Sequence, residues 1–406
     1  MQQAPTYRSL YTYAWDVQDV GVTAFVDELL AMGIHDVTLA TSYHAGKFIR
    51  PHAKNPPRVI FPQDGVVYFD PDLSRYGHIQ PQAHTDPAIR AVLPALLADG
   101  RLNVHGWTVL LHNSRIGAAY PQYTVKNAFG DPYLYSLCPM QAKVFDYALA
   151  LCADLSQQHA LQSLVLEAPG WLPYSHGYHH EFSQVVSNPW LDTMLGLCFC
   201  DACKSAARAK GIAMDDVQQR VQTHINDYLA HESAAPTNEQ AHAAAAQMAN
   251  WMEADLLDNP DFTAFIRLRQ DRVTELVRAI SEVMPASMQL AVIPTVQRPT
   301  LACWTEGSDL PALAAVADYL EIPFYEATAK RVIADAWQSL GQISVDKVRA
   351  ILRPGAPDLA NGAELEAALA GLQTLGISQF AFYNYGMLPQ HQLNQLAKTL
   401  QLGVLD

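Results

Sequence analysis

Three cysteines stand close together in the stretch "CFCDAC". Cys198, Cys200 and Cys203 have the spacing C-x-C-x-x-C. Thiolates this close in sequence can bind one zinc ion, because a tight turn directs the sulfur atoms at a tetrahedral centre that a fourth ligand completes. The preceding residues lack the strand and turn of a thioredoxin-like redox motif, so the spacing favours structural zinc. The candidates for the fourth ligand are Cys138, Cys152, Cys303 or a histidine.

A glutamate ends one of the apolar stretches of the chain. Glu167 stands where "LVLE" passes into "APGW", with Pro169 and Trp171 close behind it. A carboxyl group at such a strand end lies in a partly desolvated cleft, which raises its pKa toward that of a general acid. The alternative is a structural ion pair between Glu167 and a lysine or arginine. We expect a catalytic role, and glycoside hydrolysis is a reaction that uses such a group.

Glycoside hydrolysis usually requires a second carboxylate, as nucleophile or as base. Glu326 follows the apolar stretch "EIPFY", and Glu321 opens it. The two differ by an odd number of residues, so in an extended strand they face opposite ways. Glu306 in "CWTEGSD" is another alternative. We expect Glu326 to be the partner, with Asp16, after "YTYAW", in reserve.

Aromatic, histidine and asparagine residues gather near the predicted strand ends. Sugars present apolar C–H faces and a rim of hydroxyl groups, so a sugar site needs flat rings and a few fixed hydrogen bonds. Some of these rings should instead fill the interior of the fold. The candidate substrate-binding residues are Trp15, Tyr43, His44, His105, Trp107, His112, Asn113, Trp171, His176, His179, His180, Tyr383 and Asn384.

Four of the polar residues in "PYSHGYHHEF" suggest a different chemistry. His176, His179, His180 and Glu181 could bind a catalytic metal ion with an open coordination position. Their spacing, H-x-x-H-H-E, matches no zinc motif with a mechanical reason, so we expect them to line a substrate pocket.

The elements that position these residues alternate between short apolar runs and helical patterns. This alternation is typical of a parallel sheet surrounded by helices. Helical stretches such as 21–33, 86–100 and 361–376 show apolar residues at spacings of three and four and end in glycine. The eight predicted strands are 10–16, 36–43, 102–111, 161–167, 288–294, 318–325, 347–353 and 379–385. Eight strands close a (β/α)8 barrel.

We expect one α/β domain over residues 1–406 with two long connections. Residues 44–85 form a predicted loop after the second strand. Residues 168–260 form a predicted insertion after the fourth strand, with the cysteine cluster and several helices. Both follow carboxyl ends of strands, the face on which barrel enzymes build their sites, and long connections are usually functional.

Residues 100–205 resemble family 42 glycoside hydrolases, the β-galactosidases of clan A. The segment 134–155, "LYSLCPMQAKVFDYALALCADL", resembles the family's Cys-Pro helix, and "CFCDACKSA" resembles its later zinc cluster, with "LVLEAPGW" between them. The resemblance implies that Cys138 is the fourth zinc ligand and that Glu167 is the glutamate of the fourth strand. Leu166 replaces the family's asparagine before that glutamate, and the seventh strand ends in Arg353 where the clan has its second carboxylate.

Composition limits the partners and the compartment. The chain has 40 Asp and Glu against 26 Lys and Arg, a formal net charge of −14, and no basic stripe. Nucleic acid and anionic membranes are therefore not expected partners. No apolar run has the length of a membrane span, and six unevenly clustered cysteines do not form a secreted disulfide framework, so a cytoplasmic location is expected. The Ala-rich helices would suit a homo-oligomer.

Together these features predict a glycoside hydrolase that acts on a small glycoside or oligosaccharide by a carboxylate-pair mechanism, with structural Zn²⁺. Two alternatives stay open. One is a metal-dependent sugar isomerase, epimerase or lyase, and the other is a barrel that binds carbohydrate without cleaving it.

Overall fold

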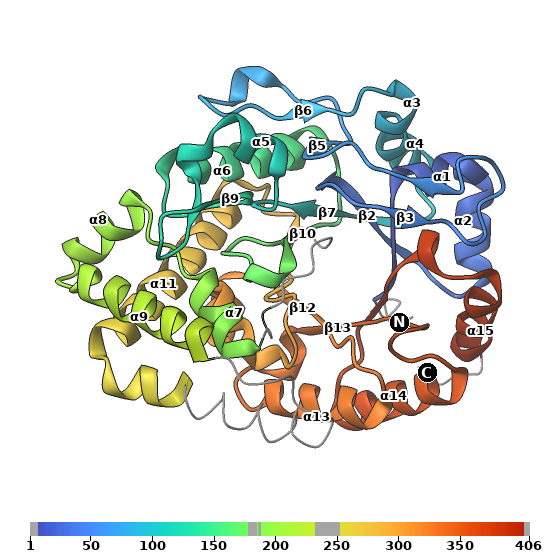
Figure 1. The fold of residues 1–406 in the computed structure, drawn as a ribbon. Helices are drawn as coiled ribbons and strands as arrows, with labels where there is room; N and C mark the ends of the chain where they lie inside the picture. Colours follow the sequence, from blue (N-terminus) through green and yellow to red (C-terminus); the bar gives the residue numbers. More distant parts are fainter. Residues whose placement is uncertain (1–6, 178–184, 186–187, 232–251, 402–406) are drawn as a thin grey trace.

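The computed structural model describes residues 7–177, 185, 188–231 and 252–401. Eight parallel strands form a closed barrel surrounded by helices (Figure 1). The strands are β1 (Arg8–Thr12), β2 (Asp36–Tyr43), β7 (Asn103–Val109), β10 (Ser163–Glu167), β11 (Gln289–Val292), β12 (Tyr319–Pro323), β13 (Val348–Leu352) and β14 (Phe380–Phe382). They pair in this order, and β1 closes the ring by pairing with both β14 and β2. The predicted (β/α)8 fold is confirmed.

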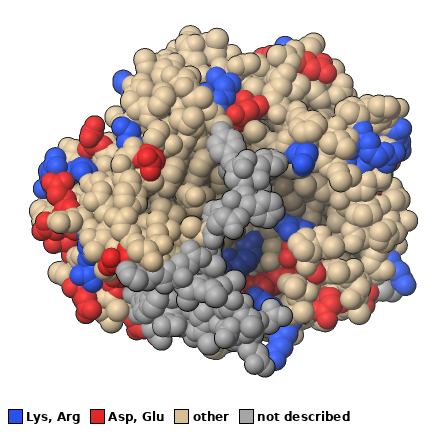
Figure 2. Space-filling model, in the orientation of Figure 1, with Lys and Arg blue, Asp and Glu red and all other residues tan. Residues whose placement is uncertain are grey.

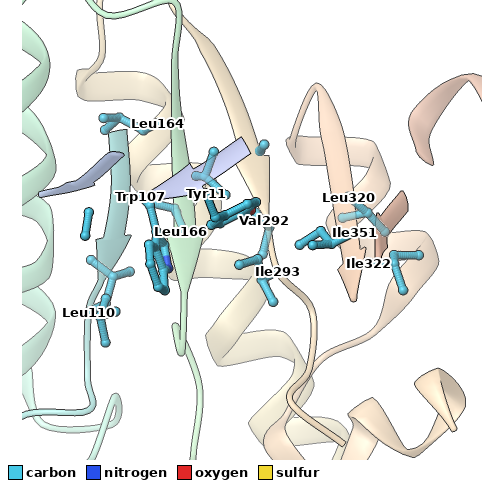
Figure 3. Close-up of a cluster of buried hydrophobic side chains, with 14 of the residues drawn as sticks. Tyr11, Trp107, Leu110, Leu164, Leu166, Val292, Ile293, Leu320, Ile322 and Ile351 are labelled. Atoms are coloured by element: carbon cyan, nitrogen blue, oxygen red, sulfur yellow. The ribbon is translucent and has the colours of Figure 1, made fainter. Parts of the chain in front are cut away.

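The barrel interior is packed with apolar side chains. Both faces of parallel strands are covered, which explains why these strands read as nearly continuous apolar runs. Every residue of β2 and of β13 is buried. Figure 3 shows Tyr11, Trp107 and Leu166, from β1, β7 and β10, packed together near Val292 of β11.

A cluster of buried polar residues lies inside the barrel, around Glu321. Glu321 of β12 is fully buried and pairs with Arg349 of β13 at 3.2 Å. The hydroxyl groups of Tyr7 and Tyr11 donate to the same carboxylate, at 2.8 and 2.5 Å. These four partners satisfy one another within the barrel, as buried charges require. Glu321 is therefore part of the barrel core, and this alternative for the second catalytic carboxylate is wrong.

The predicted helices are present, with one division. Residues 21–33 form α2 (Val22–Ala31), and residues 361–376 form α14 (Gly362–Thr374), capped by Asn361. Residues 86–100 form two helices, α3 (Pro87–Arg90) and α4 (Val92–Asp99), with Asp86 as the cap of the first. Further helices around the barrel include α6 (Ala142–Gln158), α11 (Pro260–Val283), α12 (Leu310–Val316), α13 (Ala329–Leu340) and α15 (Gln390–Gln401).

The first predicted strand, 10–16, differs from the structure at both ends. The observed strand begins two residues earlier, at Arg8, and the last residues of the predicted strand are helical. The strand ends at Thr12, and residues 14–20 form α1 (Ala14–Val20). Tyr13 and Trp15 have strand propensity, but here their rings stack on each other at the start of α1, and tertiary packing overrides such local preferences.

The predicted loop 44–85 contains short strands. These are β3 (Phe48–Ile49), β4 (Val59–Ile60), β5 (Val66–Val67) and β6 (Gln82–Ala83). β5 pairs antiparallel with the end of β2, and β6 pairs with β5, so this connection extends the sheet beyond the barrel.

The predicted insertion after β10 contains α7 (Pro189–Gly196), α8 (Asp201–Ala209) and α9 (Met214–His231) in its described part. In Figure 1 α8 and α9 lie at the left edge of the molecule, outside the ring of strands. That this segment is an insertion remains a prediction. In the described part of the chain no helix is both long and apolar enough for a membrane span.

Candidate active site

A cavity of about 380 Å³ lies at the carboxyl ends of the barrel strands. Tyr43 and Glu167 end β2 and β10, while Tyr325, Arg353 and Tyr383 follow the ends of β12, β13 and β14, and all five line it. The volume falls within the range of small-ligand sites. Figure 2 shows that the molecule is hollowed near the middle of this face, where basic and acidic side chains lie close together.

Glu167 is the only carboxylate among the described residues that line the cavity. Its Oε2 accepts a hydrogen bond of 2.5 Å from Trp107 Nε1, and it forms no ion pair with any described lysine or arginine. Burial raises the pKa of Glu167 to about 7, although the hydrogen bond from Trp107 lowers it. The carboxyl group can therefore hold a proton near neutral pH, as a general acid must.

The chain after Glu167 has a fixed path. Ala168 has a φ of 52°, in the left-handed region that few non-glycine residues adopt. The backbone N–H of Trp171 donates to Glu306 O at 3.0 Å, and a Cβ at Gly170 would lie 2.1 Å from that oxygen. Only glycine fits this close approach, so the segment that carries the carboxylate is held against residues 300–306.

Glu306 is a second buried carboxylate in this segment, and it does not line the cavity. Its carboxylate accepts hydrogen bonds from Thr295 Oγ1 and from the N–H of Val296, the latter at 3.0 Å. Burial raises the pKa of Glu306 to about 7. Because Glu306 does not line the cavity, its position suits a structural role in the connection after β11.

Tyrosine rings form one wall of the cavity. Tyr383 and Tyr13 share a hydrogen bond of 3.1 Å between their hydroxyl groups, and the ring of Tyr43 packs edge-on against Tyr13 and Trp107. Burial raises the pKa of the Tyr383 hydroxyl, so it stays protonated and can donate to a ligand.

Three cations line the same cavity, and the sequence analysis did not assign them to it. They are Lys47 from the connection after β2, Arg298 after β11 and Arg353 after β13. Arg353 follows β13, at the strand end where the resemblance to clan A places a second carboxylate. Arg298 lies in a connecting segment with no motif, so only its place after a barrel strand could have indicated it.

The two predicted partners of Glu167 do not line the cavity. Glu326 lies beyond the end of β12, and its Oε2 pairs with Arg331 at 2.7 Å. Asp16 is on α1, not at a strand end, and its Oδ1 pairs with Arg50 at 3.1 Å. Burial raises the pKa of Asp16 to about 7. The structure therefore does not bring either carboxylate together with Glu167 in this cavity.

The predicted sugar-binding residues divide into three sets. Those that line the cavity are Tyr43, His44, Trp107, His112, His176 and Tyr383. Those that lie elsewhere are Trp15, His105, Asn113, Trp171 and Asn384. His179 and His180, like Glu181, lie outside the described residues.

Most of the predicted sugar-binding residues that lie outside the cavity have a structural role. Asn113 and Asn384 cap short helices by accepting hydrogen bonds from Ile116 N and Gly386 N. Trp171 packs under Arg269 with the guanidinium 4.6 Å from its ring centre. These positions follow strands in sequence, but their side chains turn into the protein.

His105 is near the amino end of its strand, so its predicted place at the carboxyl ends is wrong. Its ring nitrogens contact Ser163 Oγ at 2.7 Å and Asp36 Oδ1 at 3.1 Å. The predicted strand 102–111 contained both ends of β7, and the position of His105 within it decides which end the side chain reaches.

Four cysteines form a buried cluster that could bind a metal ion. Cys138 follows β9 (Pro132–Leu137), and its Sγ lies 3.5 Å from that of Cys203 and 3.7 Å from those of Cys198 and Cys200. All four sulfur atoms lie within 4.8 Å of one another. Among the described residues no other group of three or more potential ligands could hold a metal ion.

The other two candidates for the fourth ligand lie outside this cluster. Cys152 is in the middle of α6, and Cys303 is in the 3-10 segment 300–306. The short spacing of three cysteines predicted a metal site, while the fourth member depends on a contact between distant parts of the chain.

No protein-family model matches the chain, and no curated protein matches it. Among solved structures, the chain is similar to the PgaB (BpsB) glycoside hydrolase domain from Bordetella bronchiseptica. The TM-score is 0.53 and the identity 14%, and the similarity covers 98% of this chain and 99% of that one. It is also similar to α-L-fucosidase isoenzyme 2 from Paenibacillus thiaminolyticus, with a TM-score of 0.51 and 11% identity, over 98% of this chain and 49% of that one. These similarities agree with a barrel of the type found in glycoside hydrolases, and the resemblance to family 42 stays a prediction.

Proposed function

We propose that the protein hydrolyses a glycosidic bond, with Glu167 as the general acid. One observation carries this proposal: in a cavity at the carboxyl ends of the barrel, Glu167 is held by Trp107 and has a pKa of about 7. Protonation of a poor leaving group near neutral pH requires a carboxyl group of this kind. The similarity in fold to two glycoside hydrolases supports the proposal.

The reaction follows from this arrangement. The protonated Glu167 donates its proton to the glycosidic oxygen while the bond from that oxygen to the anomeric carbon breaks. Positive charge develops on the sugar ring. Water then adds to the anomeric carbon, and its proton returns to the Glu167 carboxylate. The tyrosine hydroxyl groups and the apolar rings of the cavity would orient the sugar.

The geometry does not favour either of the two carboxylates that the sequence suggests as partners of Glu167. Glu326 and Asp16 pair with arginines outside the cavity lining. Some glycosidases use a tyrosine or a group of the substrate itself in place of a second carboxylate. We therefore propose that catalysis does not depend on Glu326, and that Glu167 acts with a partner other than the two predicted ones.

The test is hydrolysis of a panel of α- and β-linked aryl glycosides and natural oligosaccharides by the purified protein. Release of the aryl group or of reducing sugar supports the proposal. Binding of a sugar without cleavage would favour the carbohydrate-binding barrel. Turnover of free sugars that mild chelation stops would favour the metal-dependent isomerase.

The pH dependence of hydrolysis should report the protonation of Glu167. We expect kcat/KM to fall as the pH rises above about 7, because burial raises the pKa of Glu167 to about 7 and only the protonated form donates. A pH profile of kcat/KM measures this. If activity instead fell through the ordinary glutamate range, near pH ~4.3, Glu167 would not be the acid.

Replacement of Trp107 by phenylalanine should shift that alkaline limb to higher pH. The indole N–H stabilises the ionised carboxylate and lowers the pKa of Glu167, so its removal raises the pKa further. We also expect kcat/KM to fall about tenfold, because a hydrogen bond to a charged group is worth about 1.5–3 kcal/mol. Tyr325→Phe is the control, since Tyr325 lines the cavity but makes no hydrogen bond to Glu167. An unchanged limb in Trp107→Phe would contradict the assignment.

We also propose that the cysteine cluster binds structural zinc. Four thiolates suit a closed tetrahedral zinc site that holds the protein together and takes no part in turnover. Cys138, Cys198, Cys200 and Cys203 would be its ligands.

The surroundings of the cluster fit a negatively charged metal centre. Arg269 of α11 is fully buried, and only its Nη2 is bonded, to Thr305 O at 2.9 Å. Its Nε and Nη1 have no hydrogen-bond partner. Burial lowers the pKa of Arg269 to about 10, and the nearby charge of Cys203 opposes this. A zinc ion with four thiolates carries net negative charge, which would stabilise this buried cation.

A further inference from the structure

The charge of the cavity differs in sign from that of the whole chain. The protein has a formal net charge of −14. Among the described residues that line the cavity, three are cations, Lys47, Arg298 and Arg353, and one is an acid, Glu167. The acid is neutral below a pH of about 7. The cavity therefore concentrates positive charge in a protein that is otherwise acidic.

Arg298 has hydrogen-bonding capacity that the protein does not use. Its Nη1 donates to the neighbouring carbonyl oxygen of Gln297 at 2.6 Å, and its guanidinium lies over the ring of Tyr325 at 4.9 Å. Its Nε is buried without a partner, and among the described residues Arg298 forms no ion pair. A guanidinium with a purely structural role is normally satisfied by acceptors when it is buried.

Arg353 is partly satisfied and partly open. Its Nη1 pairs with Asp358 Oδ2 at 3.0 Å, and its guanidinium lies 4.2 Å from the ring centre of Tyr325 and 5.7 Å from that of Tyr383. Its side chain is 29% exposed. The ring of Tyr325 thus has both Arg298 and Arg353 against it, which brings two guanidinium groups to the same part of the cavity.

Asp358 pairs with Arg353, and the other acids near the two arginines have partners of their own. Asp335 accepts hydrogen bonds from Thr300 N and Oγ1, at 2.8 and 2.9 Å, and Glu326 pairs with Arg331. Glu167 is not their partner either, because the causes that set its pKa are burial and the hydrogen bond from Trp107. The two guanidinium groups and the general acid are therefore separate functional groups of one cavity.

We propose that the substrate is a sugar with an anionic substituent, a carboxylate or a sulfate ester, which Arg298 and Arg353 bind while Glu167 protonates the glycosidic oxygen. This inference rests on the proposed function for the role of Glu167, but the recognition of the anion does not. Guanidinium groups bind carboxylate and sulfate through paired, charge-assisted hydrogen bonds, and stacking on an aromatic ring fixes their plane. A neutral sugar would leave the buried Nε of Arg298 without an acceptor.

The experiment compares aryl glycosides that differ only in the anion. The pairs are aryl glucuronide with aryl glucoside, and aryl 6-sulfo-N-acetylglucosaminide with aryl N-acetylglucosaminide, each as both anomers. We expect one charged member to be preferred in kcat/KM by about ten- to a hundredfold, the range of charge-assisted hydrogen bonds. If the glucuronide is preferred to the glucoside, the anionic substituent is a carboxylate. If the 6-sulfo sugar is preferred to its neutral counterpart, the substituent is a sulfate ester. Equal or better hydrolysis of the neutral members would overturn the proposal while the hydrolase function stood.

Single substitutions test which residues bind the anionic substituent. Arg298→Gln should reduce the preference for the charged sugar, measured as the ratio of kcat/KM for the charged and neutral members of a pair, by about tenfold or more. Arg331→Gln is the matched control, because Arg331 pairs with Glu326 and does not line the cavity. A preference that survives in both Arg298→Gln and Arg353→Gln would show that these residues do not bind the anion.

A binding measurement separates this proposal from the proposed function. Calorimetry with Glu167→Gln and the methyl glycosides of glucuronic acid and glucose needs no turnover. Tighter binding of the glucuronide, weakened by added salt as expected for charge pairing, would support anion recognition even if no glycoside were cleaved. Equal binding of both sugars, and of the sulfated pair, would overturn it.

Discussion

Glu167→Gln should reduce kcat/KM by roughly 10²- to 10⁴-fold, the usual contribution of a general acid. Glutamine has nearly the same shape and can keep the contact with Trp107, but it has no proton of suitable pKa to give to the leaving oxygen. The substitution removes a buried carboxyl group, so we expect the fold to be retained. Steady-state kinetics with the best aryl glycoside measures the loss, and circular dichroism checks the fold.

Glu326→Gln is the matched control for Glu167→Gln. Glu326 is a buried glutamate at the same end of the barrel, but it pairs with Arg331 and does not line the cavity. We expect its replacement to change kcat/KM by less than about tenfold, as for a change outside the chemistry. If Glu326→Gln lost activity as severely as Glu167→Gln, the pair predicted from the sequence would be restored.

Cys203→Ser should remove the bound zinc and lower the free energy of unfolding by about 4 kcal/mol or more, because loss of a structural metal is among the few changes that cost so much. Cys203 is fully buried in α8, with its sulfur 3.5 Å from that of Cys138. Serine is a poor zinc ligand and leaves a buried hydroxyl group. Metal content by mass spectrometry and unfolding in urea measure the two effects.

Cys152→Ser separates the metal from the general cost of a buried cysteine. Cys152 is also fully buried, on α6, but is not part of the cluster. Its replacement should leave one zinc per chain and cost less than Cys203→Ser. Full zinc content with native stability in Cys203→Ser would disprove the assignment of the cluster.

The strands of the barrel were predictable because parallel strands buried on both faces leave continuous apolar runs. All eight predicted runs contain or overlap a barrel strand. The end of the first run was not predictable in this way, since residues 14–16 belong to the predicted strand 10–16 but begin the helix α1. Local propensity does not show on which neighbour an aromatic side chain packs.

The candidate site was predictable only in part. The strand-end rule placed Glu167, Tyr43 and Tyr383 together, because Glu167 and Tyr43 end barrel strands and Tyr383 directly follows one. It failed for Glu326, one residue beyond Tyr325, where the chain has already turned away from the cavity and Arg331 takes up the carboxylate. A shift of one residue decides between cavity and surface, and sequence patterns do not fix strand ends so closely.

The cations of the cavity were missed for a related reason. An arginine at the end of the seventh strand indicates in the sequence only that no carboxylate stands there, and its binding partners are not visible in the sequence. Its pairing with Asp358 and its position against Tyr325 appear only when the connections after β12 and β13 are placed side by side.

The cysteine cluster joins two points of the chain, Cys138 and Cys203, that are 65 residues apart. The chain between them includes α6, β10 and Glu167. Closing so long a loop costs conformational entropy before its contacts are gained, and such contacts form late relative to local ones. During synthesis on the ribosome, β10 is translated before Cys203 is added to the chain. The strand that carries Glu167 is therefore translated in full before Cys203 is present. The contact between Cys138 and Cys203, which closes the loop around this strand, can form only after α8 has been made.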